Sequence, residues 1–102
     1  DPKEITEALN GIEYLMHRID KGWCHPETLE WINESKQLQA LAAKRIGVLL
    51  GIKSYASVFS KLWNCQKKFL SDNAYSAMGS SNFASLDNQL REVFPEYKEK
   101  EE

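Results

Sequence analysis

Several short motifs that would assign a chemistry are missing from this sequence of 102 residues. It contains no glycine-rich loop of the kind that cradles phosphate groups, and no CxxC or HxxxH spacing of the kind that binds zinc. No apolar run approaches the roughly 18 residues that span a bilayer. The sequence therefore gives no sign of a nucleotide site, a zinc site or a membrane-spanning segment.

Cysteine and histidine are scarce, with two residues of each. His17, Cys24 and His25 lie near one another in the sequence, but structural zinc needs four ligands placed together. Adjacent residues such as Cys24 and His25 do not orient each other as a nucleophile and its base must. We therefore predict no metal, no cofactor, no small-molecule substrate and no enzymatic activity.

Cys24 and Cys65 permit one disulfide if the compartment is oxidising. An uninterrupted second helix over residues 26–50 would be about 37 Å long and would leave the two cysteines roughly 19 Å apart. That separation exceeds the roughly 7 Å that a disulfide can bridge. We expect two free thiols, and only a break near Ser35 would bring the pair together.

Apolar residues recur at every third or fourth position over most of the chain, as in amphipathic helices packed on one another. Asp1-Pro2 suits a helix start and Gly22 a helix stop. Between them the apolar seam consists of Ile5, Leu9, Ile12, Met16 and Ile19. The pattern predicts a first long helix that packs against other helices.

Three further helices are predicted after Gly22. The second covers residues 26–50, with a polar gap at 34–36 where it bends or breaks. The third begins after Ser54 and is broken or loosened at 72–73 and 79–81. The fourth is short and covers residues 82–94. The expected fold is all-α, an antiparallel bundle of three long helices plus a short fourth.

The last helix should end abruptly at Phe94, because Pro95 disfavours helical geometry in the residue before it. Phe94 and Tyr97 can still fold back onto the bundle. The charged residues 98–102 have nothing to bury and are expected to be disordered. We therefore predict a single domain over residues 1–97 with a disordered tail.

Charge is distributed unevenly around a net value of −2. Residues 44–70 carry six basic residues and no acidic one, while both flanks are acidic. We expect this basic middle to pack against the acidic flanks of its own bundle or of a second copy, and its footprint is weak for a nucleic acid or a membrane. If the basic middle does face an anion, the candidate anion-facing residues are Lys44, Arg45, Lys53, Lys61, Lys67 and Lys68.

The three tryptophans flank or precede the apolar stripes, so they suit either the core or an edge that a partner covers. The candidate partner-facing residues are Trp23, Trp31, Trp63, Phe94 and Tyr97, chosen by residue type.

The segment LDNQLREVFPEY, residues 86–97, resembles a helix found in the TrbJ-type conjugal transfer proteins, the minor-pilin family of type IV secretion systems. The opening Asp1-Pro2 followed by an amphipathic helix is also similar to the start of that family after its leader. The resemblance implies a periplasmic or extracellular helical protein, without catalysis, that contacts other secretion-pilus subunits.

Two other classes of protein fit the same residues. The seam of the first helix also suits a self-associating or adaptor module in the cytoplasm, or a small regulatory or immunity-type bundle. The basic middle would suit a helical module that binds anionic membrane or nucleic acid.

Overall fold

The computed structural model describes residues 2–17, 22–25 and 27–95, and only the backbone of residues 2–9. These residues contain five helices: α1 (Pro2–His17), α2 (Lys36–Leu50), α3 (Tyr55–Leu62), α4 (Lys67–Met78) and α5 (Phe83–Val93). The all-α class predicted from the apolar periodicity is confirmed. The division into three long helices and a short fourth is wrong. The predicted second helix is shorter than expected, and the predicted third is divided into α3 and α4.

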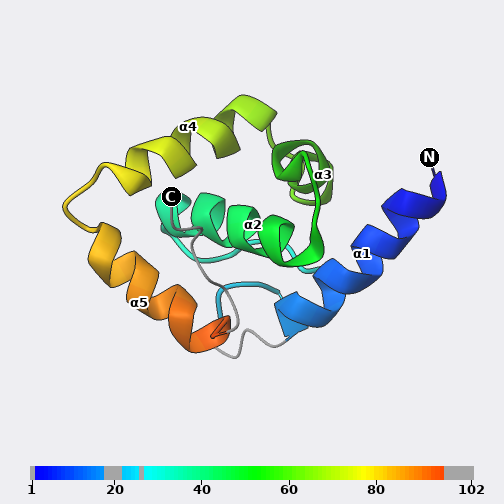
Figure 1. The fold of residues 1–102 in the computed structure, drawn as a ribbon, viewed down its shortest axis with the longest axis horizontal. Helices are drawn as coiled ribbons and strands as arrows, with labels where there is room; N and C mark the ends of the chain where they lie inside the picture. Colours follow the sequence, from blue (N-terminus) through cyan, green and yellow to red (C-terminus); the bar gives the residue numbers. More distant parts are fainter. Residues whose placement is uncertain (1, 18–21, 26, 96–102) are drawn as a thin grey trace.

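Helix α2 lies at the centre of the molecule, with α4 and α5 along two of its sides, α3 beyond its C-terminal end and α1 leading away from the body (Figure 1). A helix that is enclosed on several sides must be apolar around most of its circumference. The sequence of α2 meets this requirement, with small alanines that let neighbouring helices approach closely. Its buried apolar residues are Leu38, Ala40, Leu41, Ala42, Ala43 and Ile46.

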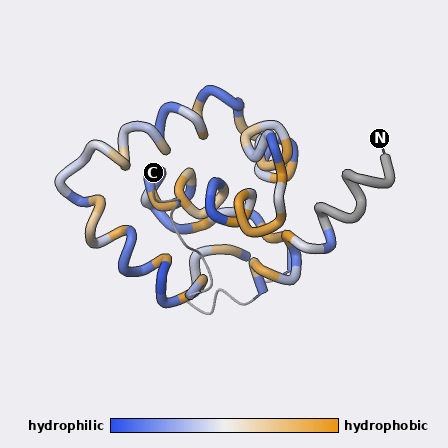
Figure 2. The backbone as a smooth tube through the Cα atoms, viewed as in Figure 1, coloured by the Kyte–Doolittle hydropathy of each residue, from blue (hydrophilic) through white to orange (hydrophobic). Residues whose placement is uncertain are grey.

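The outer helices bury one face each. Helix α5 alternates hydrophobic and hydrophilic residues along its length (Figure 2), and it buries Leu86, Leu90 and Val93. Four apolar residues from four different helices are fully buried, namely Ile12, Ile46, Phe59 and Leu90. Met16, a further member of the first seam, is also buried, whereas Ile19 and the side chains of Ile5 and Leu9 lie outside the described part.

Residues 27–35 do not extend α2, contrary to the prediction of a helix over residues 26–50. Ser35 begins α2 as its N-cap, since its hydroxyl accepts a hydrogen bond from the amide of Leu38 at 3.1 Å. The Asn33 side chain accepts a second one from the amide of Ser35 at 2.8 Å. The polar gap at 34–36 was therefore the true start of the helix, and Pro26 itself lies outside the described residues.

The predicted third helix is divided into α3 and α4 by residues 63–66. Asn64 has a φ of 51°, and the amide of Cys65 donates to the Ser60 carbonyl at 2.9 Å, so the chain turns at the end of α3. The predicted break at 72–73 is absent, because Asn73 lies inside α4 and donates to the carbonyl of Phe69 at 2.7 Å. The predicted break at 79–81 is confirmed as the connection to α5.

Gly11 marks the place where α1 approaches the end of α2. A Cβ at this position would lie 2.8 Å from a methyl carbon of Leu50, closer than side chains approach. The glycine thus contributes to packing, although it lowers the intrinsic helix propensity of α1.

Helix α5 ends as expected at the Phe94-Pro95 junction. The amide of Phe94 donates to the carbonyl of Leu90 at 2.8 Å, and the Phe94 ring is fully buried. The predicted return of Phe94 to the bundle is therefore confirmed. Tyr97 and the predicted tail at 98–102 lie outside the described residues.

Candidate interaction surfaces

The three tryptophans, which are far apart in the sequence, form one cluster. The ring centroids of Trp23 and Trp31 are 5.9 Å apart, and those of Trp31 and Trp63 are 5.6 Å apart. Phe59 continues the row at 4.7 Å from Trp63. Tilted rings at these distances pack with favourable edge and face contacts. The cluster holds the described segments 22–25 and 27–35 against the end of α3.

A hydrogen bond joins the two segments of this cluster. The indole N–H of Trp63 donates to the carbonyl of Leu29 at 3.0 Å. Leu29 has a φ of 65°, and Asn64, the residue after Trp63, also has a positive φ. Positive φ is uncommon for residues other than glycine and is kept only where surrounding contacts stabilise it. The aromatic cluster supplies those contacts.

The cluster is mainly part of the core, and this changes the list of partner-facing candidates. Trp23 is only 4% exposed and Phe94 is fully buried, so neither offers a surface to a partner. Trp31 and Trp63 are half-buried, and Tyr97 lies outside the described residues. The prediction by residue type did not separate Trp23 and Phe94, which are buried in the core, from the half-buried Trp31 and Trp63.

The cysteines and His25 lie in or beside the same region. Both cysteines are free thiols, and burial raises the pKa of Cys24 to about 12 and also raises that of Cys65. The Nδ1 atom of His25 accepts hydrogen bonds from the amides of Glu27 and Thr28 at 3.1 and 3.2 Å. In the part of the chain that is described, no three His, Cys, Asp or Glu side chains converge as a metal site would require.

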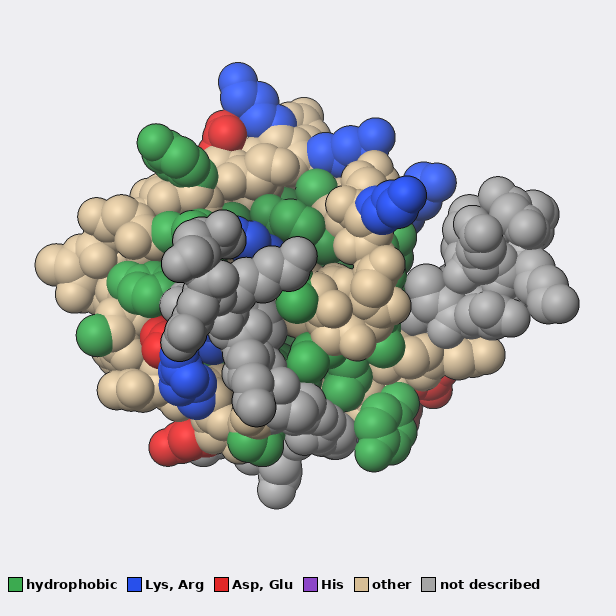
Figure 3. Space-filling view, viewed as in Figure 1, with side chains coloured by type: hydrophobic (Ala, Val, Ile, Leu, Met, Phe, Trp, Pro, Cys, Tyr) green, Lys and Arg blue, Asp and Glu red, His purple; other side chains and the backbone are tan. Residues whose placement is uncertain are grey.

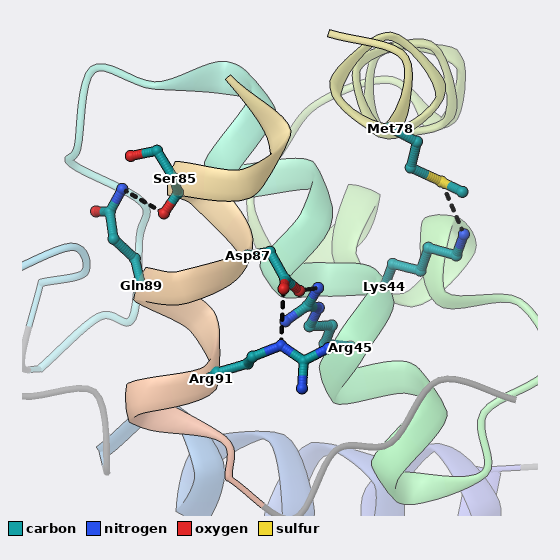
Figure 4. Close-up of polar contacts among 7 residues, drawn as sticks. All are labelled: Lys44, Arg45, Met78, Ser85, Asp87, Gln89 and Arg91. Atoms are coloured by element: carbon teal, nitrogen blue, oxygen red, sulfur yellow. Dashed lines mark hydrogen bonds and ion pairs between the residues drawn. The ribbon is translucent and has the colours of Figure 1, made fainter. Parts of the chain in front are cut away.

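Asp87 on α5 lies between two arginines (Figure 4). Its carboxylate accepts hydrogen bonds from Arg45 of α2 and, at 2.7 Å, from Arg91 one turn further along α5. Desolvation pushes the pKa of Asp87 upward, but the hydrogen bonds and charges of the two arginines outweigh it, and the net effect lowers this pKa. Arg45 is 3% exposed, so it connects two helices and does not face a solvent anion.

The remaining basic residues of the middle segment are placed differently from Arg45. Lys44 is half-buried and its Nζ donates to Sδ of Met78 at 3.2 Å. The other four are exposed, and none of them has an ion pair with a described residue: Lys53, Lys61, Lys67 and Lys68. Packing against the acidic flanks therefore accounts for Arg45 but not for these four lysines.

Two exposed apolar side chains on α4 were not identified from the sequence. Tyr75 is 84% exposed and Met78, three residues later, is 52% exposed. Residues three apart lie on one face of a helix, so the two form a continuous patch. The sequence interpretation placed a break at 72–73 and so did not put them on a helix face. Other exposed apolar side chains are Tyr14, Ile32 and Val48.

Among the helices of the described residues, none combines the length and the apolar character needed to cross a membrane. Comparisons of this chain with known protein families, with curated proteins and with solved structures found no match.

Proposed function

We propose that this chain is a non-enzymatic helical protein that acts by binding another protein, and that the partner is another subunit of a type IV secretion or conjugation pilus. The observation that carries the proposal is the exposed pair Tyr75 and Met78 on α4. A tyrosine with 84% of its surface in water contributes nothing to the core of its own domain. Aromatic residues and methionine are enriched in protein interfaces, where their burial contributes much of the affinity.

The surroundings of this pair indicate the chemistry of the partner. Met78 is flexible and can adapt to an irregular apolar surface, while Tyr75 offers both a ring and a hydroxyl. The ammonium group of Lys44 donates a hydrogen bond to the sulfur of Met78, and it has no ion pair with a described residue. A matching partner would have an apolar hollow for the ring and a carboxylate within reach of Lys44.

The class of partner comes from the resemblance of residues 86–97 to the TrbJ-type proteins. In the described part of this segment, Leu86, Leu90, Val93 and Phe94 are buried. These four residues therefore pack α5 onto the bundle and do not themselves contact a partner. Under this proposal the protein works in the periplasm or outside the cell.

Complementation of a deletion tests the proposal in the organism that carries the gene. We expect the deletion to lower conjugal transfer or secretion, and the wild-type gene to restore it. A Tyr75→Ser/Met78→Ser variant should restore it at least about tenfold less well, because interface hot spots contribute about 2 kcal/mol or more each. The matched control is Tyr14→Ser/Val48→Ser, which also removes two exposed apolar side chains and should complement fully.

A photo-cross-linking amino acid at position 75 identifies the partner directly. We expect it to capture a subunit of the secretion pilus, and the same probe at position 48 not to do so. Normal transfer in the deletion strain, or equal effects of the two double variants, would overturn the proposal. Capture of a cytoplasmic protein from position 75 would favour the adaptor or regulatory class instead.

A further inference from the structure

Three exposed lysines flank the connection between α3 and α4. Lys61 lies in the last turn of α3, and Lys67 and Lys68 are the first two residues of α4, after a connection of four residues. We call Lys61, Lys67 and Lys68 the basic corner. Lys and Arg side chains gather over this part of the molecule in Figure 3. Asp72, one turn beyond Lys68, lies on the same face of α4, so three lysines have one acidic neighbour on these helices and the corner keeps a net positive charge.

The placement of Lys67 and Lys68 is unfavourable for the isolated protein. The N-terminal end of a helix carries a partial positive charge and favours acidic residues, but the first turn of α4 contains none. Gln66, at the N-cap of α4, makes no capping hydrogen bond with its side chain. None of the three lysines has an ion pair with a described residue. An external anionic surface would offset all of these unfavourable charges together.

Apolar side chains lie in the chain between and beside these lysines. Leu62 and Trp63 directly follow Lys61, Phe69 directly follows Lys68, and all three are half-buried. Lysine stems and the edges of aromatic rings are suited to the boundary between lipid headgroups and acyl chains. An anionic bilayer offers both a negative surface and this boundary.

A nucleic acid fits the same corner less well. The net charge of the chain is −2, and both segments that flank the basic middle are acidic. Three lysines would give a weak, salt-sensitive contact with DNA. An anionic bilayer also offers an apolar boundary for the half-buried Leu62, Trp63 and Phe69, which a phosphate backbone does not.

We propose that the basic corner holds this protein against an anionic lipid surface. The contact is peripheral and reversible, and it is separate from the Tyr75 and Met78 patch that the proposed function uses. Each lysine near an anionic surface strengthens binding about fivefold. The contact should weaken steeply with salt, because the electrostatic screening length falls to about 3 Å at 1 M.

Vesicle co-sedimentation of the full chain tests this proposal. The vesicles contain equal parts of phosphatidylglycerol and phosphatidylcholine, and the control vesicles contain phosphatidylcholine alone. At low salt we expect binding to the anionic vesicles only, and loss of that binding as salt is raised toward about 1 M. A Lys67→Gln/Lys68→Gln variant should bind roughly 10- to 30-fold more weakly.

The matched control is a Lys36→Gln/Lys53→Gln variant, which changes the net charge equally. Lys36 begins α2, and Lys53 precedes α3, at the opposite end of that helix from Lys61. This variant should retain most of the binding, and circular dichroism should show that both variants are folded. Absence of binding at low salt, or equal loss in both variants, would overturn the proposal. So would tighter binding to duplex DNA than to the anionic vesicles under the same conditions.

Discussion

Arg45 on α2 and Asp87 on α5 form an ion pair that joins the central helix to the last one, and the guanidinium group is almost entirely shielded from water. Removal of Asp87 takes away a charged hydrogen-bond partner of this buried guanidinium group, which typically costs about 1.5–3 kcal/mol. Asp87→Ala should therefore lower the free energy of unfolding by about that amount, measured by urea denaturation. Arg91→Ala is the control, since Arg91 is 49% exposed and should cost at most about 1 kcal/mol.

The same carboxylate predicts how stability depends on pH. The pKa of Asp87 is lower in the folded protein than its ordinary value, because its hydrogen bonds and charge interactions with Arg91 and Arg45 outweigh desolvation. A lowered pKa contributes stability that is fully present above the unfolded-state value of about 3.9 and is lost as pH falls through the folded-state value. The free energy of unfolding should thus fall more steeply below about pH 4 in the wild type than in Asp87→Asn. Parallel curves for the two proteins would contradict this.

Two tryptophans offer a matched test of the contact between residues 22–35 and α3. The indole N–H of Trp63 donates to the Leu29 carbonyl, whereas the buried N–H of Trp31 has no hydrogen-bond partner among the described residues. Substitution by phenylalanine removes the N–H in both cases, with the same loss of volume. We expect Trp63→Phe to cost about 1 kcal/mol more than Trp31→Phe in urea denaturation. Equal costs would mean that the hydrogen bond contributes nothing.

Hydrogen exchange reports on the same contact locally. The amides of Ile32 and Asn33 both donate to the carbonyl of Trp23, at 2.8 and 3.2 Å. If the Trp63 to Leu29 hydrogen bond fixes this segment, both amides should exchange faster in Trp63→Phe than in Trp31→Phe. Amides of α2, which do not depend on the contact, serve as the internal control.

The sequence predicted the helical class and the buried faces because both depend on a local repeat. Ile12, Ile46, Phe59 and Leu90 occupy apolar positions of that repeat, and all are fully buried. The end of α5 was also predictable, since Pro95 blocks a helix by its own covalent structure. Features that depend on one or two neighbouring residues were therefore accessible without the structure.

The division of the second and third predicted helices was not accessible in the same way. Residues 27–35 have acceptable helical spacing, but Trp23, Trp31 and Trp63 bring this segment against α3 in an irregular conformation. That contact joins positions more than thirty residues apart, so a local pattern cannot reveal it. The geometric argument against a disulfide failed for the same reason. It assumed a continuous helix through residues 27–35, and that assumption was wrong.

The surface residues were the least predictable. Residue type pointed to the tryptophans, yet Trp23 is in the core, while Tyr75 and Met78 are exposed. Arg45 and Lys61 look equivalent in the sequence, but the first is buried against Asp87 and the second is exposed. Their burial differs because it depends on which face of each helix packs against another helix, and the sequence does not show which helices are neighbours.

Gly47 is predicted to be essential for the packing of α2 against α3. A Cβ at this position would lie 2.7 Å from Cβ of Tyr55, a contact that only a backbone shift could relieve. Gly47→Ala should therefore lower the free energy of unfolding by about 1–3 kcal/mol. Gly79→Ala is the control, because nothing lies within 4 Å of its Cβ position, and it should be neutral or slightly stabilising. A Gly47→Ala variant as stable as Gly79→Ala would show that α2 and α3 are not in close contact.

Cys24 is predicted to be a slowly reacting thiol in the folded protein. Burial raises its pKa from 9.0 to about 12, and only the thiolate form reacts with iodoacetamide. At pH 8 the thiolate fraction is then about a hundredfold or more lower than in the unfolded chain, and labelling of Cys24 in a Cys65→Ser variant should be slowed accordingly. Rapid labelling at pH 8 without denaturant would contradict this shift. Unfolding in urea should restore the ordinary rate, which provides the control.

Because the raised pKa favours the protonated thiol of Cys24 in the folded state, its contribution to stability is present below about pH 9 and is lost as pH rises toward 12. The free energy of unfolding should therefore decline over this range more in Cys65→Ser than in a variant that lacks both cysteines.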